Sequence, residues 1–283
     1  MVVVNIKDPI TSKIYNFYID KKLKEQLDSK VKSALGQKDE DYLIAVDGEE
    51  RAGKSTFAMQ IGKYIDPSLS LDRVCFSPDE FRKAIINAEP GQCVIFDEAY
   101  RGLSAKGALT EVNRILVSLM MEMGQKNLFV IVVLPTFYLL EKYVALWRAR
   151  VLFHIYRRNT QKGFWVCFNK KKKKLLYLKG KKDYGYGYVK SGFRGRFSKK
   201  YVIDEQEYRN KKAESLKVGY KTTKREDYLL QRDRLVYALS RELNVSTREL
   251  EKICNLYKVG LKKTSLGSII KKITDKGLSS VFS

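Results

Sequence analysis

The chain has 283 residues, of which 55 are basic and 32 acidic, so its formal net charge is +23. A hydrophobic share of 44% and an aromatic share of 12% exclude a disordered chain and suffice for a packed core. The charge is uneven, because residues 1–150 carry 21 basic and 20 acidic side chains whereas residues 151–283 carry 34 and 12. A strongly cationic second half indicates an anionic partner, either nucleic acid or a membrane surface.

The region 1–39 is expected to pack on the rest of the chain. Apolar and polar residues alternate over 2–6 and 14–19, with Asp8-Pro9 between them, which predicts two short strands and a turn. Residues 21–35 then read as a polar helix.

The region 40–157 alternates apolar strands with helical patterns, which predicts an α/β fold with a parallel sheet covered by helices on both faces. The expected strands are 42–46, 74–76, 93–96, 128–134 and 151–156. The expected helices are 54–65, one that begins at 77, 110–123 and one near 137–146. Ser77 and Glu80 form a capping box around Pro78, which marks the start of the second helix.

Residues 158–204 are predicted to form a basic β-hairpin followed by an aromatic-basic segment. Two short strands, 164–168 and 175–178, would place the lysines of 170–174 at a cationic hairpin tip that contacts phosphates or simply faces solvent. The segment 183–201 is rich in Tyr, Gly, Phe, Lys and Arg. Its aromatic rings could stack on bases while its cations follow the phosphates; the alternative is a loop packed against the core.

Residues 205–283 are predicted to form a C-terminal helical module. A helix over 205–217 precedes three helices within 226–273, and Ser246 and Glu249 form a second capping box. Because the last helix is basic, these three helices resemble a helix-turn-helix DNA-binding module. The alternative is a three-helix packing domain used for self-association.

A motif typical of phosphate binding follows the expected strand 42–46 and precedes the helix 54–65. It reads Gly48-Glu49-Glu50-Arg51-Ala52-Gly53-Lys54-Ser55, which matches G-x-x-x-x-G-K-[ST] between a strand and a helix. Lys54 would reach the β- and γ-phosphates of a nucleotide and Ser55 would bind Mg²⁺. The expected nucleotide-binding residues are therefore Gly48, Arg51, Ala52, Gly53, Lys54, Ser55 and Thr56.

A second motif ends the expected strand 93–96 with Asp97-Glu98. A carboxylate at the end of a buried strand needs a partner, and a magnesium–nucleotide supplies one. Asp97 is expected to hold the metal through water, and Glu98 to polarise the attacking water; for Glu98 a plain surface carboxylate is the alternative.

These two motifs resemble the Walker A and Walker B motifs of P-loop NTPases over residues 40–157. The Asp-Glu pair and the strand inserted between the motifs resemble the branch with an additional strand and a catalytic glutamate. That branch includes AAA+ proteins, RecA-like motors, FtsK/HerA-type DNA pumps and viral packaging ATPases. The runs 96–101 and 134–136 look similar to ATPases of viruses and mobile elements, including zonula-occludens-toxin-like ones.

The resemblance implies two further groups. A polar sensor residue is expected after the fourth strand, and Thr136 matches it, with a helix N-cap as the alternative. A ring-forming homo-oligomer would also use an arginine finger from a neighbouring subunit. The candidates are Arg101, Arg114, Arg148 and Arg150, the last two being placed with Lys54 and Glu98 as catalytic residues. His154 lies in an apolar strand and is expected to be a satisfied core residue.

The sequence thus predicts an ATP-hydrolysing, Mg²⁺-dependent protein that handles nucleic acid, DNA above all, through residues 158–283. A translocase or packaging motor of a virus or mobile element is the leading hypothesis, an ATP-gated DNA-binding regulator or assembly scaffold the second, and a small-molecule kinase the third. The longest apolar run, 128–140, is too short to span a membrane, and no signal peptide is evident. The four cysteines, which form no C-x-x-C pair, are expected to be reduced. We therefore expect a cytoplasmic protein, in the host cytoplasm if viral, without an integral membrane segment.

Overall fold

The computed structural model describes residues 2–38, 40–97, 114, 117–118, 126–218, 224–241, 245–256 and 261–276. The chain divides into two compact units, residues 1–219 and 220–283.

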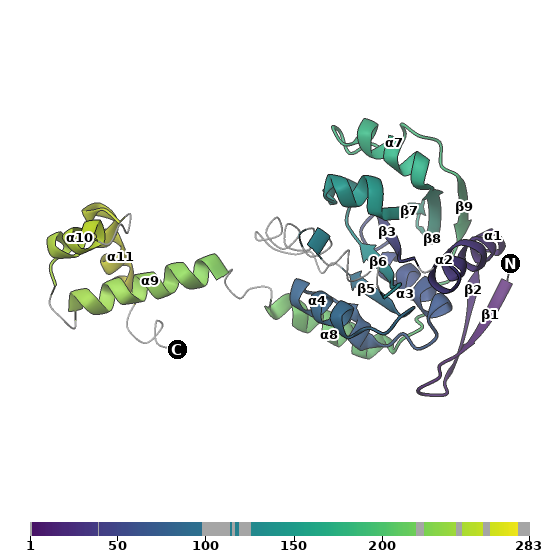
Figure 1. Ribbon diagram of the computed structural model, residues 1–283, viewed down its shortest axis with the longest axis horizontal. Helices are drawn as coiled ribbons and strands as arrows, with labels where there is room; N and C mark the ends of the chain where they lie inside the picture. Colours follow the sequence, from purple (N-terminus) through teal and green to yellow (C-terminus); the bar gives the residue numbers. More distant parts are fainter. Residues whose placement is uncertain are drawn as a thin grey trace. The chain divides into compact units, whose positions relative to one another are not determined.

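The first unit begins with a two-stranded antiparallel sheet, as the alternation predicted. Its strands are β1 (Val2–Lys7) and β2 (Ile14–Ile19) (Figure 1). The helical stretch that follows consists of α1 (Lys21–Gln26), the π-helix η1 (Leu27–Lys32) and α2 (Ser33–Gly36). The side chain of Asp20 caps α1 by accepting hydrogen bonds from the backbone N–H groups of Lys22 and Leu23.

The central sheet has seven strands in the order β4-β5-β6-β3-β7-β8-β9. The first five run parallel to one another, whereas β8 and β9 are antiparallel additions at one edge. Its strands are β3 (Tyr42–Gly48), β4 (Val74–Cys75), β5 (Cys93–Asp97), β6 (Phe129–Val133), β7 (Ala149–Arg158), β8 (Gln161–Phe168) and β9 (Phe193–Arg196). This arrangement confirms the predicted α/β fold with a mostly parallel sheet, and it places β6 between β3 and β5.

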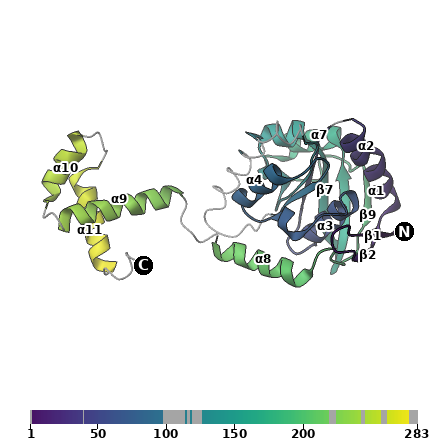
Figure 2. The same cartoon turned by 60° about the horizontal axis from the view of Figure 1, so that its bottom comes forward.

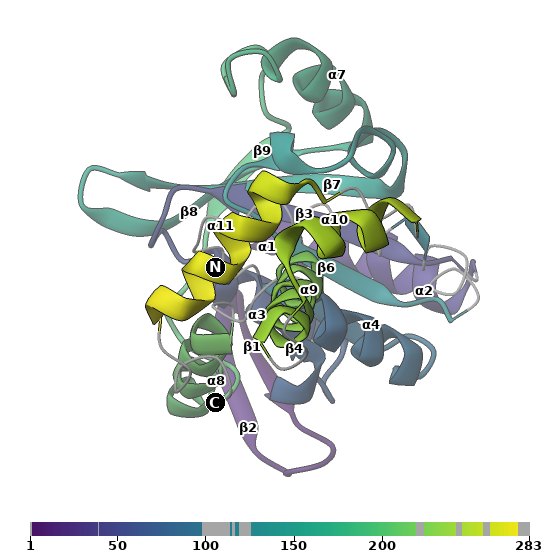
Figure 3. The ribbon, with the colours of Figure 1, turned by 90° about the vertical axis from the view of Figure 1, so that its left-hand side faces the viewer.

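Both faces of the sheet are covered, which explains why β3 is apolar from Tyr42 to Val46. Ile44 and Val46 face a cluster that includes α3 (Lys54–Ile65) and the N-terminal elements. Leu43 and Ala45 face the opposite cluster. That second cluster contains α4 (Pro78–Asn87), the 3-10 helix η3 (Phe137–Leu139), the π-helix η4 (Val144–Arg148) and α7 (Lys170–Gly180) (Figures 1 and 3).

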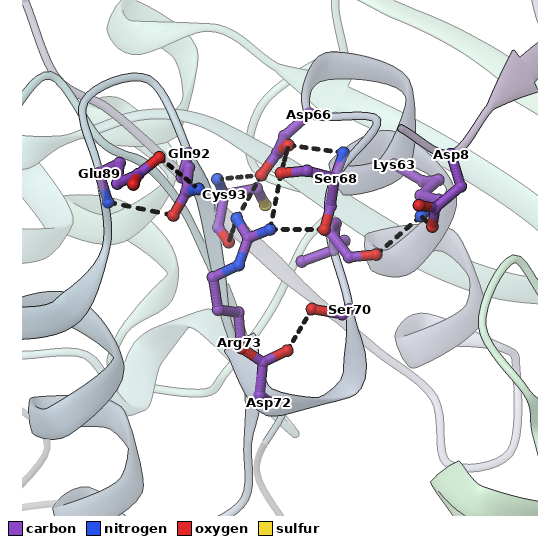
Figure 4. A network of polar contacts seen from close by, with 11 residues as sticks. Asp8, Lys63, Asp66, Ser68, Ser70, Asp72, Arg73, Glu89, Gln92 and Cys93 are labelled. Carbon is purple, nitrogen blue, oxygen red and sulfur yellow. Dashed lines mark hydrogen bonds and ion pairs between the residues drawn. The ribbon is translucent and has the colours of Figure 1, made fainter. Parts of the chain in front are cut away.

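A closed polar network ties the turn after α3 to the start of β5 (Figure 4). The Asp66 carboxylate accepts hydrogen bonds from the backbone N–H of Cys93 at 2.8 Å and of Ser68 at 2.9 Å, and it pairs with Arg73. Arg73 also donates to the carbonyl of Ser68 at 2.6 Å. Because Asp66 and Arg73 are both buried, this network holds the edge of the sheet where the parallel strands begin.

The prediction of a hairpin over 164–178 is wrong. The hairpin is formed by β7 and β8 instead, and the lysine run lies on α7, whose first turn is capped by the Asn169 side chain, which accepts from the N–H of Lys172. Lysine is a good helix former and Asn a strong N-cap, so a helix satisfies this stretch better than a strand. Lys173 is buried and donates to the carbonyls of Ala145 and Leu146.

The last helix of the first unit is α8 (Glu205–Val218), shown most clearly in Figure 2. The second unit contains α9 (Lys224–Arg241), α10 (Thr247–Leu256) and α11 (Lys263–Lys276), as predicted. Its core consists of Val236, Leu250, Leu266, Ile269 and Ile273. The predicted capping box is confirmed, because Ser246 and Glu249 bond each other's backbone N–H groups. Along the described parts of the chain, no helix has the length and apolar character that a membrane crossing requires.

Candidate nucleotide-binding site

The loop between β3 and α3 has the backbone that its glycines predict. Gly48 has a φ of 127°, and a Cβ there would lie 1.9 Å from the carbonyl oxygen of Ile155 on the neighbouring strand β7. Gly53 has a φ of 103°, with the ring of Phe197 packed 3.1 Å from where its Cβ would be. Arg51, with a φ of 58°, also adopts the left-handed region. No ordinary side chain would fit at Gly48, so the sharp turn depends on this residue.

The loop ends at the amino terminus of α3, where free backbone N–H groups and the helix dipole favour an anion. Gly53 is the N-cap residue and has no side chain to satisfy these groups. Lys54 follows at once, and its Nζ donates to the carbonyls of Gly48 at 2.6 Å and Glu49 at 3.0 Å. Burial lowers the pKa of Lys54, although the negative charges of Asp47 and Asp97 oppose this shift. The lysine side chain therefore lies across the loop, beside the amino terminus of α3, where an anion would bind.

Asp97 ends β5 at the same edge of the sheet and is only 2% exposed. Its Oδ2 accepts a hydrogen bond from the hydroxyl of Tyr208 and lies 3.3 Å from Nζ of Lys212, both residues of α8. Burial and the charge of Asp97 raise the pKa of the Tyr208 hydroxyl, and the nearby side chain of Ser55 opposes this shift. The two residues predicted to bind the metal thus both lie next to one tyrosine hydroxyl.

A cavity of about 680 Å³ opens at this point, within the range of volumes that small-molecule sites have. The residues that line it include Arg51, Gly53, Lys54, Ser55, Thr56, Asp97, Lys162, Tyr201, Tyr208, Arg209 and Lys212. Among the described residues there is no group of three or more His, Cys, Asp or Glu that could hold a metal unaided. One carboxylate and one hydroxyl instead fit Mg²⁺, which keeps several waters and takes further oxygens from phosphates. The residues present therefore fit a magnesium–nucleotide.

Beside the loop, a buried carboxylate that the sequence analysis did not single out organises the carboxyl end of β3. Asp47 is fully buried and accepts hydrogen bonds from the Phe137 backbone N–H at 2.7 Å and from the Tyr186 hydroxyl. Its other oxygen lies 2.9 Å from Nδ1 of His154. The His154 ring stacks on Tyr186 with centroids 4.0 Å apart. His154 is thus a satisfied structural residue, as predicted.

Thr136 and the finger candidates that the structure describes, Arg114, Arg148 and Arg150, do not line the cavity. Thr136 shares a hydrogen bond of 2.9 Å with Tyr186, whereas Leu134 and Pro135 face the cavity. Arg148 pairs with Asp41 at 2.7 Å, at the amino end of β3, which is the opposite edge of the sheet from Gly48. Arg150 pairs with Glu40 at 2.9 Å at the same edge. Arg114 is a helical, exposed residue. Glu98, Arg101 and most of the predicted helix 110–123 lie outside the described residues.

The aromatic-basic segment packs partly against the core rather than standing free. Tyr186 lies on His154, and Phe197 packs beneath the loop against Phe57, with ring centroids 5.0 Å apart. Tyr184 and Tyr188 remain exposed. The exposed rings are accessible to a polymer without rearrangement, as are the exposed cations that follow them, Lys190, Arg194, Arg196, Lys199 and Lys200.

Two residues at the centre of the site, Tyr208 and Lys212, were not predicted to be there. Their spacing shows that they share one face of a helix, but nothing in the local sequence indicates that this face meets Asp97. Comparison with protein-family models and with curated proteins finds no match to this chain.

Proposed function

We propose that the chain is an ATP-hydrolysing protein of the P-loop class that handles nucleic acid, as a DNA translocase or packaging-type motor of a virus or mobile element. The observation that carries the proposal is the convergence of the 48–55 loop, the amino terminus of α3 and Asp97 on one cavity. The sheet supports it, because β3 and β5, the strands that bear the two motifs, run parallel with β6 between them, so that both motifs lie at the same edge.

In this proposal the residues of the loop bind and orient the phosphates. Backbone N–H groups at the start of α3 would donate to phosphate oxygens, and Nζ of Lys54 would move from the carbonyls of Gly48 and Glu49 to the same oxygens. Ser55 and Asp97 would hold the Mg²⁺. Glu98 would orient the attacking water and accept its proton. When bound, Mg²⁺–ATP supplies the electrophilic phosphorus, the leaving group and the charge neutralisation that transfer needs.

Nucleic-acid binding is proposed for the cationic part of the chain. Described residues there that are exposed include Lys170, Lys171, Lys179, Arg194, Arg196, Arg248, Lys252, Lys262, Lys263 and Lys271. Such side chains can replace the counterions of a nucleic-acid backbone.

The decisive assay is ATP turnover by the full chain with and without DNA. The motor proposal expects DNA-stimulated turnover that disappears in Glu98→Gln while nucleotide binding is retained. If DNA leaves turnover unchanged while ATP alters the affinity for DNA, the chain is a nucleotide-gated regulator. Phosphate transfer to a nucleoside would contradict both.

The salt dependence of DNA affinity tests the partner separately. A protein that uses about 6–10 phosphate contacts should lose on the order of 10³–10⁵ in affinity between about 50 and 200 mM salt. A flat response in the full chain would refute binding through phosphate contacts.

A further inference from the structure

Helix α8 places two side chains on the pair of residues that the proposed site uses for its metal. The Tyr208 hydroxyl donates to Asp97, and Nζ of Lys212 lies 3.3 Å from the Asp97 oxygen and 3.1 Å from the Tyr208 hydroxyl. Both donors use the same carboxylate oxygen, Oδ2. Ser55, Asp97, Tyr208 and Lys212 all line the same cavity, so a hydroxyl and an ammonium group occupy this oxygen of Asp97 beside Ser55.

The burial of Asp97 explains why such a partner is needed. A carboxylate that is only 2% exposed is costly without a counter-charge, and Lys212 supplies one from a side chain that is 32% exposed. Mg²⁺ binds oxygen ligands at about 2.0–2.1 Å in a near-ideal octahedron. The Tyr208 hydroxyl and the Lys212 ammonium occupy Oδ2 of Asp97, so a metal or metal-bound water that takes this oxygen must displace them.

The rest of α8 has attachments that do not involve Asp97. Lys211 donates to the carbonyls of Leu71 at 2.9 Å and Val74 at 2.8 Å. The Tyr208 ring packs on Phe76, with centroids 5.6 Å apart. Loss of the Asp97 contacts would therefore release one face of the helix without detaching it from the first unit.

We propose that Tyr208 and Lys212 hold the metal position while the site lacks nucleotide, and that magnesium–nucleotide binding displaces them and shifts α8. This inference rests on the proposed nucleotide site and adds its regulation. Because α8 ends at Val218 and α9 begins at Lys224, the shift would act on the chain segment that leads into the C-terminal helices. Occupancy of the site would thereby be signalled toward the unit proposed to contact DNA or another copy.

The sign of a substitution effect tests this competition. Calorimetric titration of the full chain with ADP in the presence of Mg²⁺ should give about tenfold tighter binding for Lys212→Ala than for wild type, because a competitor of the metal is gone. Tyr208→Phe keeps the ring and should tighten binding by about threefold. Lys199→Ala, which removes an exposed lysine outside the cavity lining, is the matched control and should match wild type. With ADP and EDTA, Lys212→Ala should show no tightening.

Three outcomes would overturn the inference, and they are distinguishable. Weaker binding of Mg²⁺–ADP to Lys212→Ala would make Lys212 a phosphate ligand, and unchanged binding would show that it does not compete. In either case the proposed nucleotide site itself would stand. No binding of Mg²⁺–ADP to wild type would remove the nucleotide site and this inference together.

Amide hydrogen exchange of the wild-type chain gives an independent readout that needs no substitution. Mg²⁺–ADP should slow exchange in residues 48–56 and accelerate it in α8, whereas ADP with EDTA should leave α8 unchanged. Helix α7, which packs on β7, β8, η3 and η4, is the internal control. Slower or unchanged exchange in α8, with residues 48–56 protected, would contradict the displacement.

Discussion

Buried charges are balanced differently at the amino edge of the parallel sheet, where its strands begin, and at the carboxyl edge, where they end. At the amino edge, Asp66 and Arg73 satisfy each other and neighbouring backbone groups in a closed network (Figure 4). At the carboxyl edge, Asp97 is neutralised by Lys212, a flexible and partly exposed side chain next to a cavity. A closed network stabilises a fold, whereas a carboxylate held by a replaceable cation can exchange partners. The difference is what we expect if the amino edge is structural and the carboxyl edge is the proposed nucleotide site.

Arg73→Met tests the amino edge and has the largest expected effect. It leaves the buried Asp66 carboxylate without its cation, so the free energy of unfolding should fall by about 3 kcal/mol. Urea unfolding measures this loss, with Arg82→Met, at an exposed position of α4, as control. Affinity of the folded protein for Mg²⁺–ADP should not change; a change would show that the two edges are coupled.

Lys54→Ala tests the carboxyl edge. It removes the charged donor that spans the loop, so the affinity for Mg²⁺–ADP should fall about 100-fold. The free energy of unfolding should change by less than about 1 kcal/mol, because the lysine bonds only loop carbonyls. Titration calorimetry and urea unfolding measure the two quantities. If Lys54→Ala greatly lowered the free energy of unfolding but kept the affinity for Mg²⁺–ADP, the carboxyl edge would be structural and not the nucleotide site.

Lys173, on α7, offers a test of a buried charge that belongs to neither of these two sites. Burial lowers its pKa from 10.5 to about 8. Below pH 8 Lys173 is protonated in both the folded and the unfolded chain, so burial of the ammonium group lowers the free energy of unfolding by its full amount. Between pH 8 and 10.5 the folded chain loses this proton first, so wild-type stability gains from the rise in pH.

Lys173→Met cannot show that gain. The free energy of unfolding of wild type minus that of Lys173→Met should therefore rise by about 2 kcal/mol between about pH 7.5 and 10. Urea unfolding at both pH values checks the difference, with Lys171→Met, an exposed position on the same helix, as control. A difference that does not depend on pH would contradict the lowered pKa.

Tyr186→Phe has the smallest expected effect. The ring keeps its stacking on His154, but the hydroxyl that donates to the buried Asp47 is lost, so the free energy of unfolding should fall by about 1.5 kcal/mol. Tyr188→Phe, at an exposed ring, is the control for the same chemical change. Equal effects of the two substitutions in thermal unfolding would argue against a structural role for the Asp47 contact.

The sequence predicted those features whose physical cause is local. Strands buried on both faces are continuous apolar runs, as at 42–46, and the glycines and lysine of 48–54 require a tight loop before a helix. The lysine run was wrongly predicted to be a hairpin tip because Lys173 occupies a buried position of α7. A helical pattern would require an apolar residue at that position, so the sequence did not show one. The contact between Tyr208 and Asp97 joins residues 111 positions apart, so no local pattern could reveal it.

The most direct test of the account is a crystal structure of the full chain with Mn²⁺ and ADP, in which Mn²⁺ replaces Mg²⁺ and its anomalous scattering locates the metal. We predict an anomalous peak between Ser55 and Asp97, phosphates at the amino terminus of α3, and Lys212 displaced from Asp97. Nucleotide and metal bound elsewhere, with Lys212 still paired to Asp97, would contradict the account.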